Sequence, residues 1–156
     1  MTRIDFYILQ GSAGDDRWHF ACRLIEKAFH QQHRILVALD SAEDAAAFDQ
    51  LLWTFKPESF IPHRIADPAP GSAADNPVLI SATPPATLPF PAPRSLLVNL
   101  SQQVPEVFRQ FERLAEVVIQ DQGVLKNTRE HYDFYRKQGY SIDHRKIGSE
   151  LGSDGR

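Results

Sequence analysis

The chain has 156 residues, of which 42% are hydrophobic, and this is enough to bury the core of one globular domain. Its formal net charge of -3 excludes a broadly basic surface that holds nucleic acid directly, so we expect any link to DNA to be indirect. The single cysteine, Cys22, excludes an intrachain disulfide, and because the sequence has neither a signal-peptide pattern nor an apolar run of roughly 20 residues, we expect a cytoplasmic protein.

The first third of the chain alternates predicted strands and helices. Residues 4–9 are a short apolar run, rich in β-branched and aromatic side chains, that predicts a strand. A helix should follow, because Asp15 and Asp16 can cap its exposed amides. Residues 34–39 are typical of a strand covered on both faces, and residues 41–44 resemble the capping box that opens a helix. The apolar stripes predicted for these two helices consist of Trp18, Cys22, Ile25 and Phe29, and of Ala45, Phe48, Leu52 and Phe55.

The rest of the chain continues the alternation. Three further strands are predicted at residues 77–81, 95–100 and 116–119, and the last of these is the final strand expected along the chain. Pro105 fits the first turn of a short helix. The inward residues predicted for that helix are Val107, Phe108, Phe111 and Leu114. A final helix is expected over residues 121–137, ending at Gly139, which can take the left-handed conformation found beyond helix ends.

This order predicts an α/β fold: one three-layer domain with a mainly parallel sheet of about five strands and helices on both faces. Residues 68–93 contain 8 of the 11 prolines and are interpreted as loops around one short strand. We expect the domain to cover residues 1–147. Residues 148–156 contain one large apolar side chain and are expected to form a flexible tail.

The turn after the first predicted strand, residues 10–16, is where α/β domains often bind nucleotides. Gly11 and Gly14 allow a tight turn, but the sequence has neither G-x-G-x-x-G nor G-K-[ST]. Asp15 and Asp16 would repel a phosphate at the start of the helix. We interpret the segment as a turn with helix caps, and a small nucleotide-binding enzyme that uses Gly11 to Asp16 is the alternative function.

Catalytic and metal-binding patterns are missing elsewhere. His30 and His33 lie three residues apart near a helix end, but no third ligand is evident, so solvated histidines are the better interpretation. His63, beside a proline turn, is more typical of a structural or interface role. Cys22 lies on an apolar stripe and is interpreted as a core residue. We therefore predict no catalytic residues, no cofactor and no metal site.

Two segments are suited to binding. In residues 52–63, Trp53 follows the inward Leu52 and cannot share the centre of that helix face, and Phe60 lies beyond a proline turn. Large aromatic side chains placed there are candidate hot spots of a protein interface, because each removes about 150–250 Å² from water. A satellite cluster packed beneath the proline-rich loops is the alternative interpretation.

The second segment is the last predicted helix. Residues 126–146 contain six Lys or Arg residues against three Asp or Glu residues, which makes this stretch locally basic. Arg129, Tyr132 and Arg136 are three and four residues apart and share one helix face, flanked by His131 and Tyr135. An aromatic ring between two guanidinium groups can hold an acidic peptide with an aromatic end. A solvated helix face is the alternative.

At these two segments the chain resembles the chi subunit family of bacterial DNA polymerase III. The resemblance covers most of the chain and is carried by residues 5–9, 52–63 and 129–140. The middle segment fits W-x-x-x-P-x-S-F-[IV]-P-H, the most specific of the three patterns. The resemblance implies a Rossmann-like domain and a non-catalytic subunit, which pairs with the psi subunit and is tethered through psi to the clamp loader. The residues implied to contact psi are Trp53, Phe60 and Pro62.

The resemblance also implies that the basic helix receives the acidic C-terminal tail of single-stranded DNA-binding protein. The residues implied to bind this tail are Val118, Lys126, Arg129, Tyr132 and Arg136. Asp133 and Leu125 depart from the family, which tends to have basic residues at both positions. These departures predict a lower affinity for an acidic tail unless Lys126 and Lys137 compensate.

Overall fold

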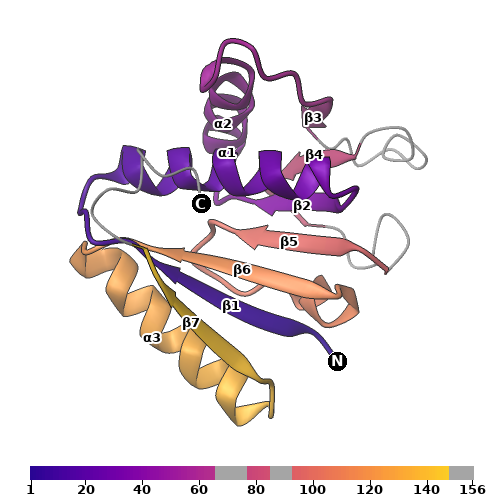
Figure 1. The fold of residues 1–156 in the computed structure, drawn as a ribbon. Coiled ribbons are helices and arrows are strands. Elements are labelled where there is room, and N and C mark those ends of the chain that lie inside the picture. The colour runs from indigo at the N-terminus through magenta and orange to yellow at the C-terminus, as the bar shows by residue number, and fades with distance from the viewer. Residues whose placement is uncertain (66–76, 85–92, 148–156) are drawn as a thin grey trace.

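A single sheet of seven parallel strands forms the centre of the computed structural model, which describes residues 1–65, 77–84 and 93–147 (Figure 1). The strands are β1 (Arg3–Ile8), β2 (Arg34–Ala38), β3 (His63–Ile65), β4 (Val78–Ser81), β5 (Ser95–Asn99), β6 (Arg113–Val118) and β7 (Ile142–Lys146). Their order in the sheet is β3-β4-β2-β5-β6-β1-β7, and every neighbouring pair is parallel. The first strand therefore lies between two strands from the C-terminal part of the chain.

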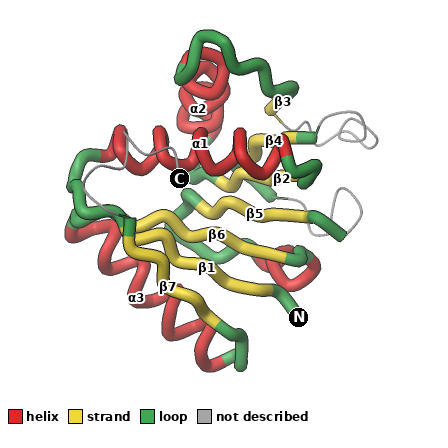
Figure 2. The backbone as a smooth tube through the Cα atoms, in the orientation of Figure 1, coloured by secondary structure: helices red, strands yellow, loops and turns green. Residues whose placement is uncertain are grey.

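Helices α1 (Gly14–His30) and α2 (Ala42–Thr54) cover one face of this sheet (Figures 1 and 2). Their buried side chains include the predicted Ala45, Phe48 and Leu52, while Trp18 and Phe29 are partly buried at the margin. Cys22 is fully buried, as predicted for a core residue, and burial raises the pKa of its thiol to about 12. The thiol therefore stays protonated at neutral pH and packs as a small apolar group.

The 3₁₀ helix η1 (Glu106–Gln110) and helix α3 (Gln122–Lys137) cover the opposite face. Phe108 of η1 and Tyr135 of α3 are fully buried there, against Phe6 of β1 and Leu114 of β6. Helices thus lie on both faces of a parallel sheet, which confirms the predicted fold class.

Most of the predicted helix ends are confirmed by their hydrogen bonds. The Ser41 hydroxyl accepts a hydrogen bond from the Asp44 amide at 3.0 Å, which caps α2. The Asp121 carboxylate accepts one from the Val124 amide at 3.1 Å, which caps α3. Gly139, just beyond α3, has a φ of 85°, the left-handed conformation that favours glycine.

The start of α1 differs from the prediction. The residue before the helix is Ala13, which offers no side-chain cap, and Asp15 and Asp16 lie inside the first turn instead. They still favour the helix, because negative charge is stabilised at a helix N-terminus.

The prediction of about five strands was wrong, because two edge strands were missed. β3 has only three residues and directly follows Pro62, and β7 has four exposed residues out of five, so neither shows an apolar run. β6 also begins at Arg113, before the predicted start, and is not the last strand. Leu114 belongs to β6, since the short helix ends at Gln110.

Two sequence predictions fall largely outside the described residues. The predicted tail, 148–156, lies outside them, as does most of the proline-rich stretch, within which β4 confirms the predicted short strand. In the part of the chain that the structure describes, no helix is long and apolar enough to cross a membrane.

Candidate binding surfaces

A groove of about 470 Å³ lies between α3 and strands β1, β6 and β7. Apolar and aromatic side chains form most of its wall, with one arginine and one aspartate from α3. The lining residues are Phe6, Ile8, Val118, Gln120, Leu125, Thr128, Arg129, Tyr132, Asp133 and His144. The groove therefore joins apolar surface to a guanidinium group.

Three aromatic rings from three different elements meet in this groove. The ring of Tyr132 lies edge-on to Phe6, with centroids 6.0 Å apart, and 5.4 Å from the ring of His144. Phe6 and His144 stack at 5.9 Å. Because two neighbouring rings contact Tyr132, its orientation is held by packing, and it can offer an ordered apolar surface to a ligand.

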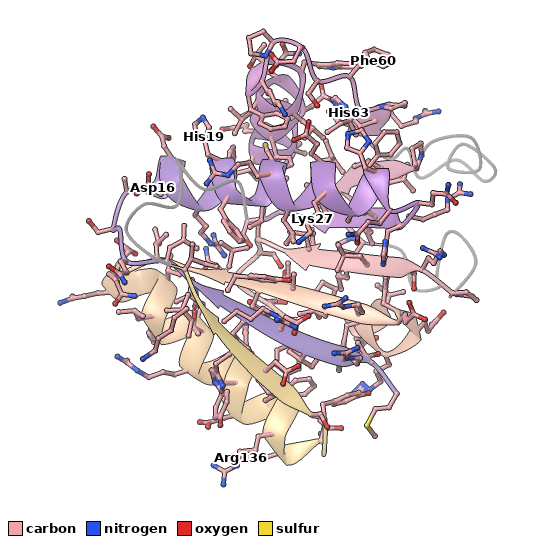
Figure 3. All side chains as sticks on the ribbon, viewed as in Figure 1. Asp16, His19, Lys27, Phe60, His63 and Arg136 are labelled. Carbon is pink, nitrogen blue, oxygen red and sulfur yellow. The ribbon has the colours of Figure 1, made fainter. Side chains whose placement is uncertain are left out.

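The groove contains part of the residue set predicted from the sequence. Three predicted residues line it: Val118, Arg129 and Tyr132. Lys126 and Arg136 are exposed on α3 but do not line it, and Figure 3 shows Arg136 at the far end of the helix, pointing away from the sheet. Leu125 and Asp133, the two positions at which the resemblance implies basic residues, both line the groove.

The basic stretch 126–146 is divided between the two faces of the sheet. Arg145 of β7 lies on the face opposite its neighbour His144, since successive strand residues alternate. Its guanidinium lies 3.2 Å from the carboxylate of Asp5, which is buried and also bonded to Arg113 at 2.7 Å. Arg145 therefore neutralises a buried acid on the α1 side and adds no charge to the groove.

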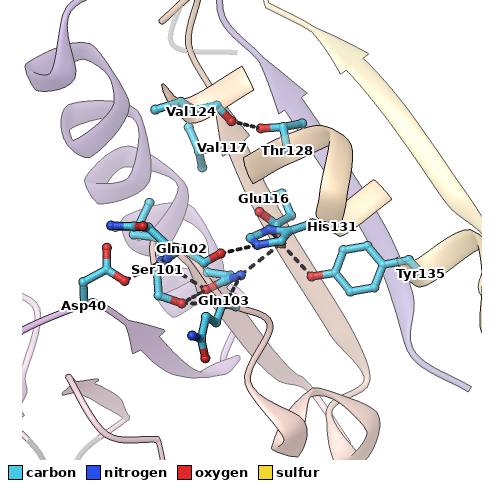
Figure 4. Close-up of polar contacts among 12 residues, drawn as sticks. Asp40, Ser101, Gln102, Gln103, Glu116, Val117, Val124, Thr128, His131 and Tyr135 are labelled. Atoms are coloured by element: carbon cyan, nitrogen blue, oxygen red, sulfur yellow. Dashed lines mark hydrogen bonds and ion pairs between the residues drawn. The ribbon is translucent and has the colours of Figure 1, made fainter. Parts of the chain in front are cut away.

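Behind the groove, α3 is joined to the sheet by a buried polar network (Figure 4). One oxygen of Glu116 on β6, Oε2, accepts hydrogen bonds from the Tyr135 hydroxyl at 2.6 Å, from Asn99 Nδ2 at 3.0 Å and from His131 Nδ1 at 3.0 Å. The other ring nitrogen of His131, Nε2, lies 2.7 Å from the carbonyl oxygen of Gln102. His131 and Tyr135 are thus buried, and the sequence prediction that they flank a surface was wrong.

The network shifts the pKa values of both α3 residues. Burial by itself would lower the pKa of His131, but the hydrogen bond that its ring donates to Glu116 and the negative charge of that carboxylate outweigh burial and raise that pKa above 6.5. Burial and the same carboxylate raise the pKa of Tyr135, so its hydroxyl remains a donor at all ordinary pH values. The spacing of residues 131 and 135 was a visible signal, but their acidic partner 15 to 19 positions away was not.

A second surface lies at the other end of the sheet, on α2 and β3. Only four large hydrophobic side chains in the described ranges are exposed, and three of them belong to this region: Trp53 at 40%, Phe60 at 71% and Ile65 at 41%. The Trp53 and Phe60 rings lie 5.6 Å apart, and Pro62 is half-buried nearby in sequence. Ile65 was not predicted, since a single isoleucine after a proline turn carries no pattern.

The buried side chain of His63 packs against Trp53, one of the residues of this apolar patch. Its buried ring lies 4.1 Å from that of Trp53 (centroid to centroid). Nδ1 is 2.7 Å from the Ile61 carbonyl oxygen, and Nε2 is 3.1 Å from the Asp49 carbonyl oxygen of α2. The histidine therefore joins the proline turn to the helix. Of the structural and interface roles predicted for His63, these contacts support the structural one.

The turn that could have bound a nucleotide is occupied by protein groups. An added Cβ at Gly11 would collide with the Asp16 carboxylate, so that carboxylate lies directly against the turn. Arg17 donates to the carbonyl oxygen of Val117 at 2.9 Å, at the carboxyl end of β6. Negative charge beside the turn and an engaged arginine disfavour phosphate binding. Within the described residues, no group of three or more potential metal ligands is found.

Fold and surfaces together define an open parallel α/β domain of the Rossmann-like class, with an apolar patch at one edge and an aromatic groove near the other. A family model described as "DNA polymerase III chi subunit, HolC" matches residues 1–143. The chain therefore belongs to the DNA polymerase III chi subunit family.

Individual relatives support the same family. A protein of Pseudomonas aeruginosa named DNA polymerase III subunit chi is 35% identical over 147 residues, covering 93% of this chain and 97% of the relative. Proteins of the same name from Haemophilus influenzae and Escherichia coli are 27% and 23% identical, covering 92% of this chain and 96% and 97% of their own lengths. The family inferred from the sequence patterns is confirmed.

Proposed function

We propose that this chain is a non-catalytic accessory subunit of a bacterial DNA polymerase III holoenzyme, acting in the cytoplasm during DNA replication. Its α2–β3 patch pairs with the psi subunit, and its α3 groove binds the acidic C-terminal tail of single-stranded DNA-binding protein. Because psi connects to the clamp loader, the chain links the clamp loader to protein-coated DNA and contacts DNA only indirectly. The observation that carries the proposal is the α3 groove, in which Arg129 stands beside an ordered tyrosine.

The groove suits an acidic peptide with an apolar end. Ile8, Leu125 and Tyr132 are partly exposed in the groove and offer apolar surface that an aromatic or aliphatic side chain can cover. Arg129 is exposed at the same place, and no ion pair to it is found among the described side chains. A free guanidinium can bind a carboxylate through two hydrogen bonds, so peptide charge and peptide side chain would be held together.

We expect Arg129→Ala to weaken binding of a synthetic acidic tail peptide by roughly tenfold or more, because a charge-assisted hydrogen bond at the groove is lost. Titration calorimetry at low salt measures this directly, since charge attraction is then least screened. Arg136→Ala and Lys126→Ala should have smaller effects, because neither side chain lines the groove.

Two further variants sharpen this experiment. Asp133→Asn removes the only acidic side chain in the groove lining and should strengthen peptide binding. Lys137→Ala, on the same helix but outside the groove, is the matched control and should change little. Absence of peptide binding to the wild type at low salt would reject the tail site.

The psi surface rests on the gathering of exposed apolar side chains. Exposed contiguous apolar area on a small domain marks interaction sites more often than chance placement. Here Trp53 and Phe60 contact each other, and a buried histidine holds Trp53 in position. Large aromatic anchors of this kind dominate the energy of protein interfaces.

We expect the double variant Trp53→Ala, Phe60→Ala to weaken complex formation with psi by more than about thirtyfold, because two hot-spot side chains are removed. Co-expression with tagged psi, followed by affinity purification and quantification of the retained chain, measures the loss. Arg129→Ala is the reciprocal control and should leave the psi complex intact. An undiminished complex in the double variant would move the psi surface elsewhere.

A further inference from the structure

Helix α3 has two functional sides that share the same turns. Arg129 and Tyr132 face the groove, whereas His131 and Tyr135 point into the protein. The groove exists only while α3 keeps its distance from β1 and β6, since its walls come from both the helix and the sheet. Whatever fixes the inner side of α3 therefore also fixes the geometry of the outer side.

Besides apolar packing, the inner side of α3 is held by hydrogen bonds that meet at one oxygen atom. Glu116 Oε2 accepts from His131 at 3.0 Å and from Tyr135 at 2.6 Å, so it is bonded to two successive turns of α3 (Figure 4). His131 immediately precedes Tyr132, the ring that forms the groove wall. A shift of His131 would therefore be passed directly to Tyr132 and to its contacts with Phe6.

The hydrogen bonds of His131 require two protons on its ring. Nδ1 faces the Glu116 carboxylate and Nε2 faces the carbonyl oxygen of Gln102, and both partners are acceptors. Neutral imidazole has one N–H group and can satisfy only one of them, whereas imidazolium donates to both. The connection between α3, β6 and the loop after β5 is thus complete only when His131 carries a positive charge.

We propose that His131 and Glu116 are a positioning pair for the tail-binding groove, and that the affinity of the groove for an acidic peptide falls as the pH rises and His131 loses its second proton. This inference rests on the tail-binding function proposed above. His131 contacts no ligand in this scheme and acts through the position of α3.

The charged groups around His131 set the direction of the pH effect. Glu116 faces it from β6, Glu130 and Tyr135 belong to its own helix, and Arg17 of α1 lies near Glu116. The Gln102 carbonyl faces it from the loop after β5, where the Gln102 amide is bonded to Asp40. Burial lowers the pKa of His131, but Glu116 outweighs burial and leaves it raised. Tight binding should therefore be complete below about pH 6.5 and decline as pH rises through the folded-state pKa.

The test is calorimetry of the full chain with a synthetic acidic peptide between about pH 6 and pH 9, where the peptide carboxylates remain ionised. We expect the wild-type affinity to fall roughly threefold to tenfold over this range. His131→Arg, which keeps its charge throughout, should lose most of this decline. His131→Gln, which is never charged, should bind weakly at all pH values and show no decline.

His144 is the competing titratable group, because it lines the groove itself. A pH dependence that survives in His131→Arg and disappears in His144→Gln would overturn the proposal. In the wild type without any peptide, the protection of the α3 amides against hydrogen exchange, corrected for the intrinsic base-catalysed rate at each pH, should fall over the same pH range. Unchanged α3 protection would also overturn the proposal. Wild-type binding that depends on Arg129 but not on pH would leave the tail site standing and reject the positioning pair.

Discussion

Glu116→Leu is expected to lower the free energy of unfolding by about 3–5 kcal/mol, because it leaves a buried imidazolium without its carboxylate. The hydroxyl of Tyr135 and the amide of Asn99 lose their acceptor in the same step. Removing one partner of a buried network costs more than the bond itself contributes, since the remaining groups stay desolvated. Urea denaturation followed by far-ultraviolet circular dichroism measures the difference.

The pH dependence of the free energy of unfolding is a second test of the same variant. The folded-state pKa of His131 lies above its unfolded value near 6.5, so its stabilising contribution is complete below about pH 6.5 and is lost as pH rises through the folded value. Glu116→Leu should remove this slope. Glu130→Leu, at an exposed position of α3, is the control and should change stability by less than about 0.5 kcal/mol. Equal stability of the Glu116 and Glu130 variants would show that the buried network does not contribute to the free energy of unfolding.

Phe108→Ala should also lower the free energy of unfolding by about 3–5 kcal/mol, because it leaves a cavity between η1 and α3. The ring is fully buried and packs against Tyr135 at 5.4 Å and Tyr140 at 5.1 Å, on both sides of the end of α3. Thermal or urea unfolding of the variant measures the loss.

The matched control for this substitution is Phe60→Ala in the same chain. Phe60 is mostly exposed, so its removal should change stability by less than about 0.5 kcal/mol, although it should weaken the psi complex. The two phenylalanines thus separate packing from partner binding. A Phe108 variant as stable as the Phe60 variant would contradict the described core.

The sequence predicts the parts of this fold whose signal is local. Helical spacing located α2 and α3, and Ser41, Asp121 and Gly139 mark helix ends that the structure confirms. β7 was missed because an edge strand exposed to water needs little apolar character. Its place in the sheet comes from pairing with β1, a contact between chain ends that no local pattern records.

The same limit applies to the α3 groove. Arg129 and Tyr132 could be predicted to share a face, because helical periodicity depends only on spacing. Phe6 and His144 complete the groove from strands at opposite ends of the chain, and only the sheet order brings them together. Arg145 shows the reverse case: it counts as positive charge in the sequence, but the alternation of β7 turns it to the other face, onto Asp5.

The position of β1 between β6 and β7 also bears on how the protein is synthesised. The ribosome makes β1 first, but both of its neighbours lie beyond residue 112, and the outer one ends at residue 146. Until β6 has been made, the nascent strand therefore has no partner on either edge, and Phe6 lacks its ring contacts with Tyr132 and Tyr135 of α3. Completion of the sheet must wait until residue 146 has left the exit tunnel, which gives chaperones time to act on the unpaired β1 segment.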